Sequence, residues 1–289
     1  MRKTVVSNRQ SRRILLLGAS GMLGRMLRAV WQKNPPQDTE VTPVFRGRAD
    51  DAFALQWHPG AQTDGLPKID AVVAMWGVKP GSDAALEENT ALAIAAQELA
   101  RDLGATKVLH ASSAAIYQPG PDPLDEEASQ IPPTPYGKAK LDMEAAVAHW
   151  HAENPTGPES VLMRIGNVAG ADSIFLNLAK GDRIRLDRFS DGSAPARSYI
   201  APQDLAGAIV SLLRSDITGP VNLSAPVATG MDQIALAAGS TIDWVPAPET
   251  ALPKVQLDCG RLQTVYTFNK HSAEATYLVD SARATGVWP

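Results

Sequence analysis

The chain has 289 residues, of which 44% are hydrophobic and 20% are charged, which is ordinary globular composition. Its net charge of −4 argues against a nucleic-acid partner, and it lacks the run of about 18 apolar residues that a membrane span needs. The single cysteine, Cys259, excludes an internal disulfide and is typical of a protein from the reducing cytoplasm. His149 and His151 have no third ligand at a metal-binding spacing, so we also expect no metal.

A glycine-rich turn follows the first predicted strand. Residues 14–17 form a short apolar run typical of a buried parallel strand, and Gly18, Gly21 and Gly24 come directly after it. An amphipathic segment then extends to about Trp31. Strand, glycine turn and helix in this order are typical of a fold that binds a dinucleotide pyrophosphate at a helix N-terminus. The spacing is G-x-x-G-x-x-G, which differs from the common G-x-G-x-x-G.

Two arginines follow the second predicted strand, residues 41–45. Many dinucleotide-binding folds carry a carboxylate here that binds the adenine ribose, whereas this chain has Arg46 and Arg48. A guanidinium group can bind a 2′-phosphate through two hydrogen bonds, so we favour NADP over NAD as the cofactor. Solvated loop arginines are the alternative.

Strands and helices continue to alternate as far as Gly170. Apolar runs predict strands at 54–57, 69–76, 107–113 and 160–165, and helices are expected from Ser82 or Asp83 to Leu103 and from Tyr136 to Trp150. This alternation predicts the α/β class, with a doubly wound parallel sheet of the Rossmann type.

The pattern weakens after residue 170. We expect helices at 175–180 and 204–213, an irregular charged segment at 183–189, and a strand at 221–223 that returns to the main sheet. We therefore predict a dinucleotide-binding domain over 13–170, with a returning segment near 198–225. Residues 171–289 would mainly form a small substrate-binding lobe.

A tyrosine and a lysine begin the predicted helix after the 107–113 strand. Tyr136 and Lys140 are four residues apart and therefore lie on one face of that helix. A phenol has a pKa near 10, and a nearby ammonium lowers that pKa towards the range of a useful acid or base. A serine at the end of the strand could hold the oxygen of a substrate alcohol or ketone. Tyrosine at a half-buried position and lysine in solvent is the simpler explanation of the same spacing.

These motifs, in this order, resemble those of the extended short-chain dehydrogenase/reductase family, the NAD-dependent epimerase/dehydratase group. The similarity covers roughly residues 13–225. The segments that carry it are 18–24, Asn89 in Glu-Glu-Asn-Thr, 110–117, Tyr136 with Lys140, 164–170 and 197–204.

The resemblance implies a role for each matching residue. Tyr136 would be the acid/base, Lys140 would lower its pKa and hold the nicotinamide ribose, and Ser113 would orient the reacting oxygen. The expected cofactor-binding residues are Gly18, Ser20, Gly21, Met22, Leu23, Gly24, Arg46, Arg48, Met75, Trp76, Tyr136 and Lys140. The expected substrate-binding residues are Lys79, Ser112, Asn167 and Arg197. The resemblance also implies a possible homodimer formed through the helices near 83–103 and 136–150.

Two departures from the family pattern concern the reaction. Ala114 and Ala115 stand where the dehydratases of this group carry an acidic pair, which excludes elimination of water by such a pair. The substrate lobe is also shorter than in typical 4-epimerases, so a substrate smaller than a nucleotide sugar remains an alternative. We therefore expect an NAD(P)-dependent oxidoreductase or epimerase that acts on a secondary alcohol or ketone of a small-molecule substrate, a nucleotide sugar in the first instance. An NADPH-dependent reductase of a small carbonyl compound and a non-catalytic NADP(H)-sensing protein are the alternatives.

Overall fold

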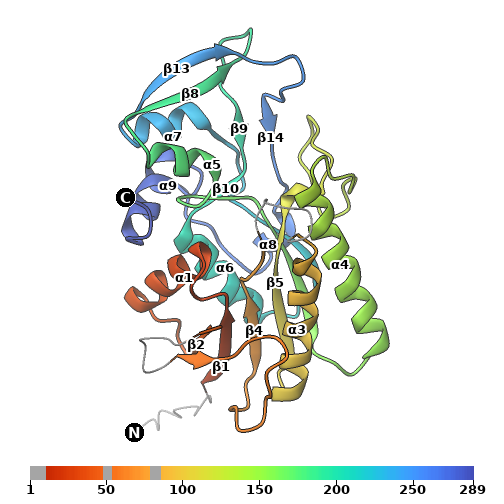
Figure 1. The fold of residues 1–289 in the computed structure, drawn as a ribbon. Coiled ribbons are helices and arrows are strands. Elements are labelled where there is room, and N and C mark those ends of the chain that lie inside the picture. Colours follow the sequence, from red (N-terminus) through yellow and green to blue (C-terminus); the bar gives the residue numbers. More distant parts are fainter. Residues whose placement is uncertain (1–10, 48–53, 79–85) are drawn as a thin grey trace, which may run out of the picture.

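A parallel β-sheet forms the centre of the protein (Figure 1). The computed structural model describes residues 11–47, 54–78 and 86–289. The strands lie in the order β11-β6-β5-β4-β1-β2-β3, and each pairs in parallel with its neighbours. Their bounds are β1 (Arg12–Leu17), β2 (Thr39–Phe45), β3 (Leu55–Gln56), β4 (Ala71–Ala74), β5 (Lys107–Ser113), β6 (Glu159–Ile165) and β11 (Gly219–Leu223). The doubly wound parallel sheet predicted from the sequence is confirmed.

The strand order reverses between β1 and β4. The chain passes from β1 to β2 on one side and later to β4 on the other, so the loops that leave β1 and β4 diverge. All four residues of β4 are buried, as expected of a strand covered on both faces. A crevice at the carboxyl ends of two such strands is the usual ligand position in an open α/β sheet.

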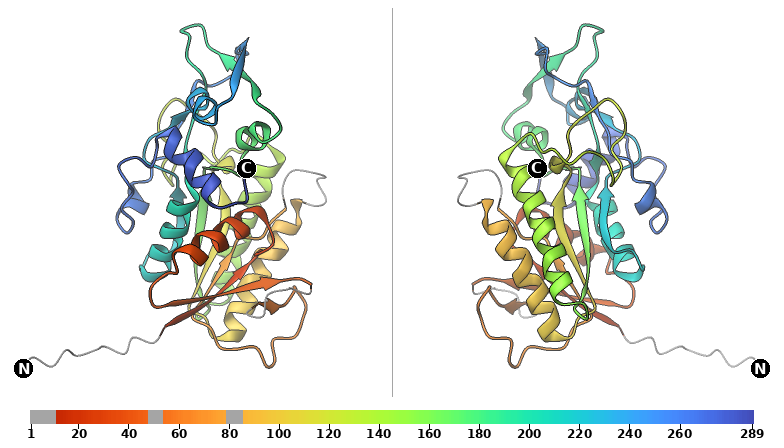
Figure 2. Two further views of the ribbon diagram at one scale, coloured as in Figure 1. Left: turned by 90° about the vertical axis from the view of Figure 1, so that its left-hand side faces the viewer. Right: turned by 90° about the vertical axis from the view of Figure 1, so that its right-hand side faces the viewer.

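Helices cover both faces of this sheet (Figure 2). Helices α1 (Met22–Lys33) and α6 (Pro202–Arg214) pack on one face, and α3 (Glu88–Leu103) and α4 (Pro135–Glu153) pack on the other. Alternate strand residues separate the two layers, because Leu16 belongs to the α1/α6 core and Leu15 to the α3 core. The predicted cap of α3 at Ser82 or Asp83 lies outside the described residues.

The C-terminal elements gather beyond the carboxyl edge of the sheet, except for α8 (Gly260–Gln263), which packs beside the last strand of the sheet (Figure 1). The others are β7 (Asn167–Val168), α5 (Ser173–Leu178), β8 (Arg183–Arg188), β9 (Ala196–Arg197), β10 (Tyr199–Ile200), β12 (Thr229–Gly230), α7 (Met231–Ala237), β13 (Thr241–Pro246), β14 (Lys254–Val255) and α9 (Ala275–Ala284). Strand β11 pairs with β6, so the chain returns to the main sheet between these elements. The domain division near residue 170 stays a prediction. Within the described residues, we find no helix with the length and apolar character to cross a bilayer.

The charged segment after α5 is a strand, and the expectation of irregular structure there was wrong. Residues Arg183–Arg188 form β8, which pairs in parallel with β13. Ile184 and Leu186 are buried while Arg183 and Arg185 are exposed, which is the two-residue alternation of a half-buried strand. The arginines on the exposed face concealed this alternation because they dominate the composition of the segment.

Candidate active site

A cavity of about 730 Å³ lies at the carboxyl edge of the sheet, where β1, β4, β5 and β6 end. The expected site residues that line it are Gly18, Ser20, Gly21, Met22, Leu23, Arg46, Met75, Trp76, Ser112, Ser113, Tyr136, Lys140 and Asn167. Gly24 and Arg197 do not line it, and Arg48 and Lys79 lie outside the described residues. Residues that are distant in the sequence therefore meet at the position where α/β folds bind ligands.

The glycine turn is packed too tightly for side chains. Gly18 has a φ of +78°, and a Cβ on it would lie 2.6 Å from the backbone nitrogen of Trp76. A Cβ on Gly24 would lie 2.2 Å from the Gly18 carbonyl oxygen, so Gly24 supports the turn from behind. Gly21 begins α1 without a side-chain cap, and the first turn of α1 holds no acidic residue. The free N–H groups and the helix dipole fit an anion such as a pyrophosphate.

Helix α4 carries the tyrosine and lysine into the cavity. It begins where the Thr134 hydroxyl accepts a hydrogen bond from the Gly137 N–H (3.1 Å), with Pro135 in the first helical turn. Lys140 Nζ donates to the Ala111 carbonyl oxygen (2.9 Å) and lies 5.9 Å from the centre of the Tyr136 ring. Lys140 is only 3% exposed, so the lysine is not the solvated surface residue that the spacing alone also allowed.

Burial dominates the acidity of both groups. Burial is the larger effect on Lys140 and lowers its pKa to about 8. The negative charge of Glu144 partly opposes this lowering. Burial raises the pKa of Tyr136, and a hydrogen-bond interaction with Ser113 opposes that rise. We expected Lys140 to lower the pKa of Tyr136, whereas in the structure this pKa is raised. The physical reason is that desolvation of the phenolate is the larger effect, while the ammonium donates to the Ala111 carbonyl.

Ser113 ends β5 beside Tyr136. Its hydroxyl oxygen accepts a hydrogen bond from the Ala115 N–H (3.2 Å), at the start of the 3₁₀ turn Ala114–Ile116. That bond does not use the hydroxyl proton, which can be donated to a neighbouring oxygen such as that of Tyr136. Ser112 differs, because its hydroxyl donates to the buried carboxylate of Glu144.

Asn89 is buried beside the cavity and fixes the turn that follows β4. It is 1% exposed, accepts a hydrogen bond from the Val78 N–H (3.2 Å) and donates to the carbonyl oxygens of Val78 (3.3 Å) and Leu86 (2.9 Å). A Cβ on Gly77 would lie 2.9 Å from Asn89 Oδ1 and 3.2 Å from Lys140 Nζ. Asn89 therefore holds the turn after β4 against the lysine.

Arg197 lies in β9, apart from the cavity. Its guanidinium donates to the carbonyl oxygens of Ala196 (2.8 Å) and Pro253 (3.3 Å). Burial lowers the pKa of Arg197. Its assignment to substrate binding stays a prediction.

Trp57 and Asp172 line the cavity although the sequence did not single them out. Trp57 is 5% exposed, and its ring centre lies 6.0 Å from that of Trp76. Asp172 caps α5 through the Phe175 N–H (3.3 Å) and accepts the Tyr199 hydroxyl (3.2 Å). Burial raises the pKa of Asp172 to about 6. The position of Trp57 directly after β3, at the same sheet edge as Arg46, is the signal that could have found it.

Cys259 and the two histidines of α4 lie elsewhere. Cys259 is buried, which raises its pKa to about 11, and its sulfur contacts Ser224 Oγ at 3.0 Å. His149 faces Glu153 (3.3 Å) and His151 faces Glu159 (4.0 Å). In the ranges that the structure describes, no three His, Cys, Asp or Glu side chains gather as a metal site would require.

The family model described as "NAD dependent epimerase/dehydratase family" matches residues 14–224. This chain belongs to the NAD-dependent epimerase/dehydratase family. The membership confirms the family predicted from the motifs, and the match runs from the glycine turn through Tyr136 and Lys140 to β11. The cavity at the sheet edge of this family member holds part of the matching segments, namely most of the glycine turn together with Ser113, Tyr136, Lys140 and Asn167.

Relatives of this chain carry the names of enzymes that act on nucleotide sugars. A UDP-glucose 4-epimerase of Lacticaseibacillus casei is 30% identical over 197 residues, which are 58% of this chain and 59% of that protein. The chain thus matches well under two thirds of the length of that relative.

Solved structures share the fold. A UDP-glucose-4-epimerase from Stenotrophomonas maltophila, with bound NAD and formylated UDP-arabinopyranose, has a TM-score of 0.74 at 19% identity and covers 95% of this chain and 99% of its own. An NAD-dependent NDP-hexosamine 5,6-dehydratase involved in tunicamycin biosynthesis has a TM-score of 0.75 at 17% identity and covers 96% and 97%. Because an epimerase and a dehydratase match equally well, this likeness concerns the fold alone.

Proposed function

We propose that this protein is an NAD(P)-dependent oxidoreductase or epimerase that acts on a secondary alcohol or ketone of a nucleotide-linked sugar. The observation that carries the proposal is that Ser113, Tyr136 and Lys140 line the same cavity as the glycine turn at the start of α1. A proton-transfer group and an anion-binding turn in one cavity are what a hydride-transfer enzyme requires. The name of the curated relative supports the sugar-nucleotide substrate.

The cofactor would be held along the β1–β4 edge. The Gly18–Gly21 turn and the N-terminus of α1 would bind its pyrophosphate, and Tyr136 and Lys140 would face its nicotinamide half. A dinucleotide bound there supplies the acceptor and donor of the hydride. Arg46 is exposed, lines the cavity and directly follows β2, which favours NADP over NAD.

The three polar side chains divide the proton chemistry between them. The raised pKa of Tyr136 keeps its phenol protonated at neutral pH, so it is prepared to donate a proton to a substrate oxygen. The Ser113 hydroxyl, which interacts with Tyr136, would donate a hydrogen bond to the same substrate oxygen. The Lys140 ammonium favours the phenolate that remains after proton donation.

Epimerase and reductase reactions use the same residues and differ in the fate of the cofactor. An epimerase returns the hydride to the other face of its substrate, so the cofactor copurifies and is not consumed. A reductase releases oxidised cofactor in each turnover, so its rate depends on added NADPH. Arg46 slightly favours the reductase, because it favours NADP.

The test is a screen of nucleotide sugars and of small aldehydes and ketones with NADPH and NADH. Absorbance of the reduced nicotinamide reports reduction, and chromatography of the sugar products reports epimerisation. In Tyr136→Phe we expect the rate to fall by about 10²–10⁴-fold while dinucleotide binding is kept. Tyr277→Phe, in α9 and outside the cavity lining, is the matched control. If every measurable function survives in Tyr136→Phe, the catalytic role proposed for Tyr136 is wrong. Dinucleotide binding without turnover of any substrate by the wild type would favour the non-catalytic alternative.

A further inference from the structure

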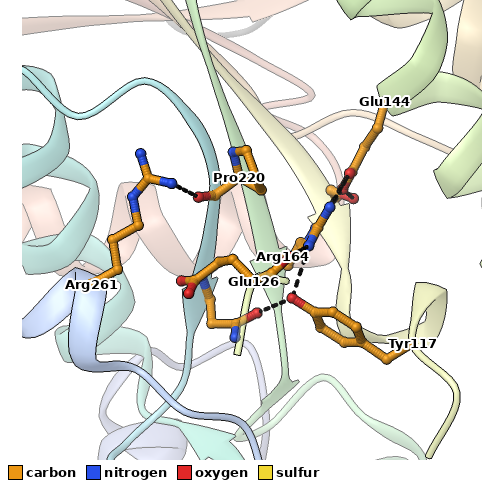
Figure 3. A network of polar contacts seen from close by, with 8 residues as sticks. Tyr117, Glu126, Glu144, Arg164, Pro220 and Arg261 are labelled. Atoms are coloured by element: carbon orange, nitrogen blue, oxygen red, sulfur yellow. Dashed lines mark hydrogen bonds and ion pairs between the residues drawn. The ribbon is translucent and has the colours of Figure 1, made fainter. Parts of the chain in front are cut away.

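A buried carboxylate lies beneath the cavity and outside its lining. Glu144 is 5% exposed and follows Lys140 by one turn and Tyr136 by two turns of α4, so the three share one face of the helix. Its carboxylate accepts hydrogen bonds from the Ser112 hydroxyl and from Arg164, whose Nη2 lies 2.8 Å from Glu144 Oε2 (Figure 3). One carboxylate thus connects the helix of the candidate site to β5 and β6.

Arg164 carries the contacts onward to the C-terminal elements (Figure 3). Its Nη1 donates to the Tyr117 hydroxyl (3.0 Å) and to the Glu126 carbonyl oxygen (2.7 Å). The Tyr117 hydroxyl donates to Asn222 Oδ1 in β11 (2.8 Å). Asn222 Nδ2 donates to the carbonyl oxygens of Leu124 and Asp258, both at 2.9 Å. This network leaves few polar atoms of the ion pair without a partner.

Stability alone does not explain this ion pair. Desolvation of two buried charges offsets most of their attraction, and well-packed apolar side chains of similar volume are often as stable. A carboxylate one helical turn from a buried lysine has a second effect, because it stabilises the ammonium.

We propose that Glu144 is a positioning residue of the candidate site: its negative charge keeps Lys140 in the ammonium form, and its bond from Ser112 fixes the end of β5 beside Ser113. This inference rests on the proposed Ser113–Tyr136–Lys140 site and adds a residue that touches neither substrate nor cofactor. Glu144 acts through its neighbours, since it does not line the cavity.

The groups around Lys140 agree with this assignment. From β5, His110 is buried and neutral, since burial and then the Lys140 charge lower its pKa to about 3. From α4, Tyr136 is a protonated phenol, and from the α3 side Asn89 is uncharged. From β6, Arg164 is positive and bonded to Glu144. Among the described residues, Glu144 is thus the acidic group that supports the lysine charge against burial.

The direct test is a pH titration of the lysine Cε–Hε NMR signals in the full chain labelled with ¹³C-lysine. Lys140→Met identifies the Lys140 signal. In Glu144→Gln we expect the Lys140 midpoint to fall by about one pH unit, which is a tenfold change in the proton-dissociation constant. Asp142→Asn is the matched control, since Asp142 is exposed on the same helix and pairs with Lys138 (2.7 Å); its Lys140 midpoint should equal that of the wild type. An unchanged midpoint in Glu144→Gln overturns the proposal.

A second variant covers the case in which Glu144→Gln does not fold, because Arg164 is then left as an unpaired buried charge. The double variant Glu144→Gln/Arg164→Met removes both charges, and its Lys140 midpoint should also fall. A purely structural ion pair predicts a wild-type midpoint in this variant, and that result would overturn the assignment.

Activity separates this inference from the proposed function. With a nucleotide sugar as substrate, the alkaline limb of the kcat/KM profile should move to lower pH in the variant that folds. A lowered NMR midpoint without any turnover by the wild type would remove the proposed enzyme and leave the Glu144–Lys140 coupling in place. Turnover that depends on Tyr136, together with an unchanged midpoint, would remove the coupling alone.

Discussion

Gly137 packs directly on the backbone of Ala115. A Cβ at position 137 would lie 2.1 Å from the Ala115 carbonyl oxygen, closer than any real contact of that kind. The first turn of α4 therefore rests on the turn that follows β5. Because Tyr136 precedes this contact and Ser113 precedes Ala115 by two residues, the approach of the two backbones brings the phenol and the serine hydroxyl into one cavity.

Gly137→Ala should separate these two groups. The added methyl meets backbone atoms that cannot rotate away, so we expect a loss of about 1–3 kcal/mol in the free energy of unfolding. Turnover should fall further than stability predicts, because the start of α4 must move away from Ser113. Urea denaturation and kcat/KM measure the two effects. Gly120→Ala is the control, since a Cβ there meets nothing within 4 Å; equal behaviour of the two variants would argue against the contact.

Lys140→Met should lower activity without lowering stability. Burial disfavours the ammonium, so an apolar side chain of similar length costs little in the folded state. The positive charge beside Tyr136 is lost, and we expect kcat/KM to fall by about 100-fold or more. Lys138→Met, on the exposed side of the same helix, should leave both quantities near the wild-type values. A parallel loss of thermal stability in Lys140→Met would indicate a mainly structural lysine.

Arg46→Ala should change which dinucleotide is preferred. A guanidinium bound to a 2′-phosphate contributes about 1.5–3 kcal/mol, so the Kd for NADPH should rise by about 10-fold or more. The Kd for NADH should stay nearly constant, because NADH lacks that phosphate. Titration of the two cofactors by isothermal calorimetry measures both values, with the exposed Arg185→Ala in β8 as control. Equal weakening of NADH and NADPH would contradict the assignment of Arg46.

His110 should make the fold sensitive to acid. The histidine is 1% exposed, and in the folded state its pKa is lowered from 6.5 to about 3. Between these two pKa values, the unfolded chain binds a proton on this histidine that the folded chain does not bind. His110 therefore leaves the free energy of unfolding unchanged above about pH 6.5 and lowers it progressively as the pH falls towards 3. In His110→Leu, the urea midpoint should depend less on pH between about 4 and 6.5. The same substitution at the exposed His149 should retain the wild-type slope, and an unchanged slope in His110→Leu would contradict the buried neutral state.

Local patterns in the sequence predicted the parallel sheet, the glycine turn and the Tyr136–Lys140 pair. They succeeded because buried strands, tight turns and helix faces leave their periodicity within about ten consecutive residues. They failed at β8, where the exposed arginines outweighed the two buried residues in the composition, and they gave Trp57 no role at the cavity.

Tertiary structure alone decided the chemistry of the site. The sequence predicted that Lys140 would lower the pKa of Tyr136, whereas burial among elements far apart in the chain raises it and lowers that of the lysine. The bonds from Ser112 and Arg164 to Glu144 likewise join β5, β6 and α4, whose separation in the sequence conceals them. Desolvation and charge coupling depend on every group packed around an atom, and the spacing of residues along one segment does not contain that information.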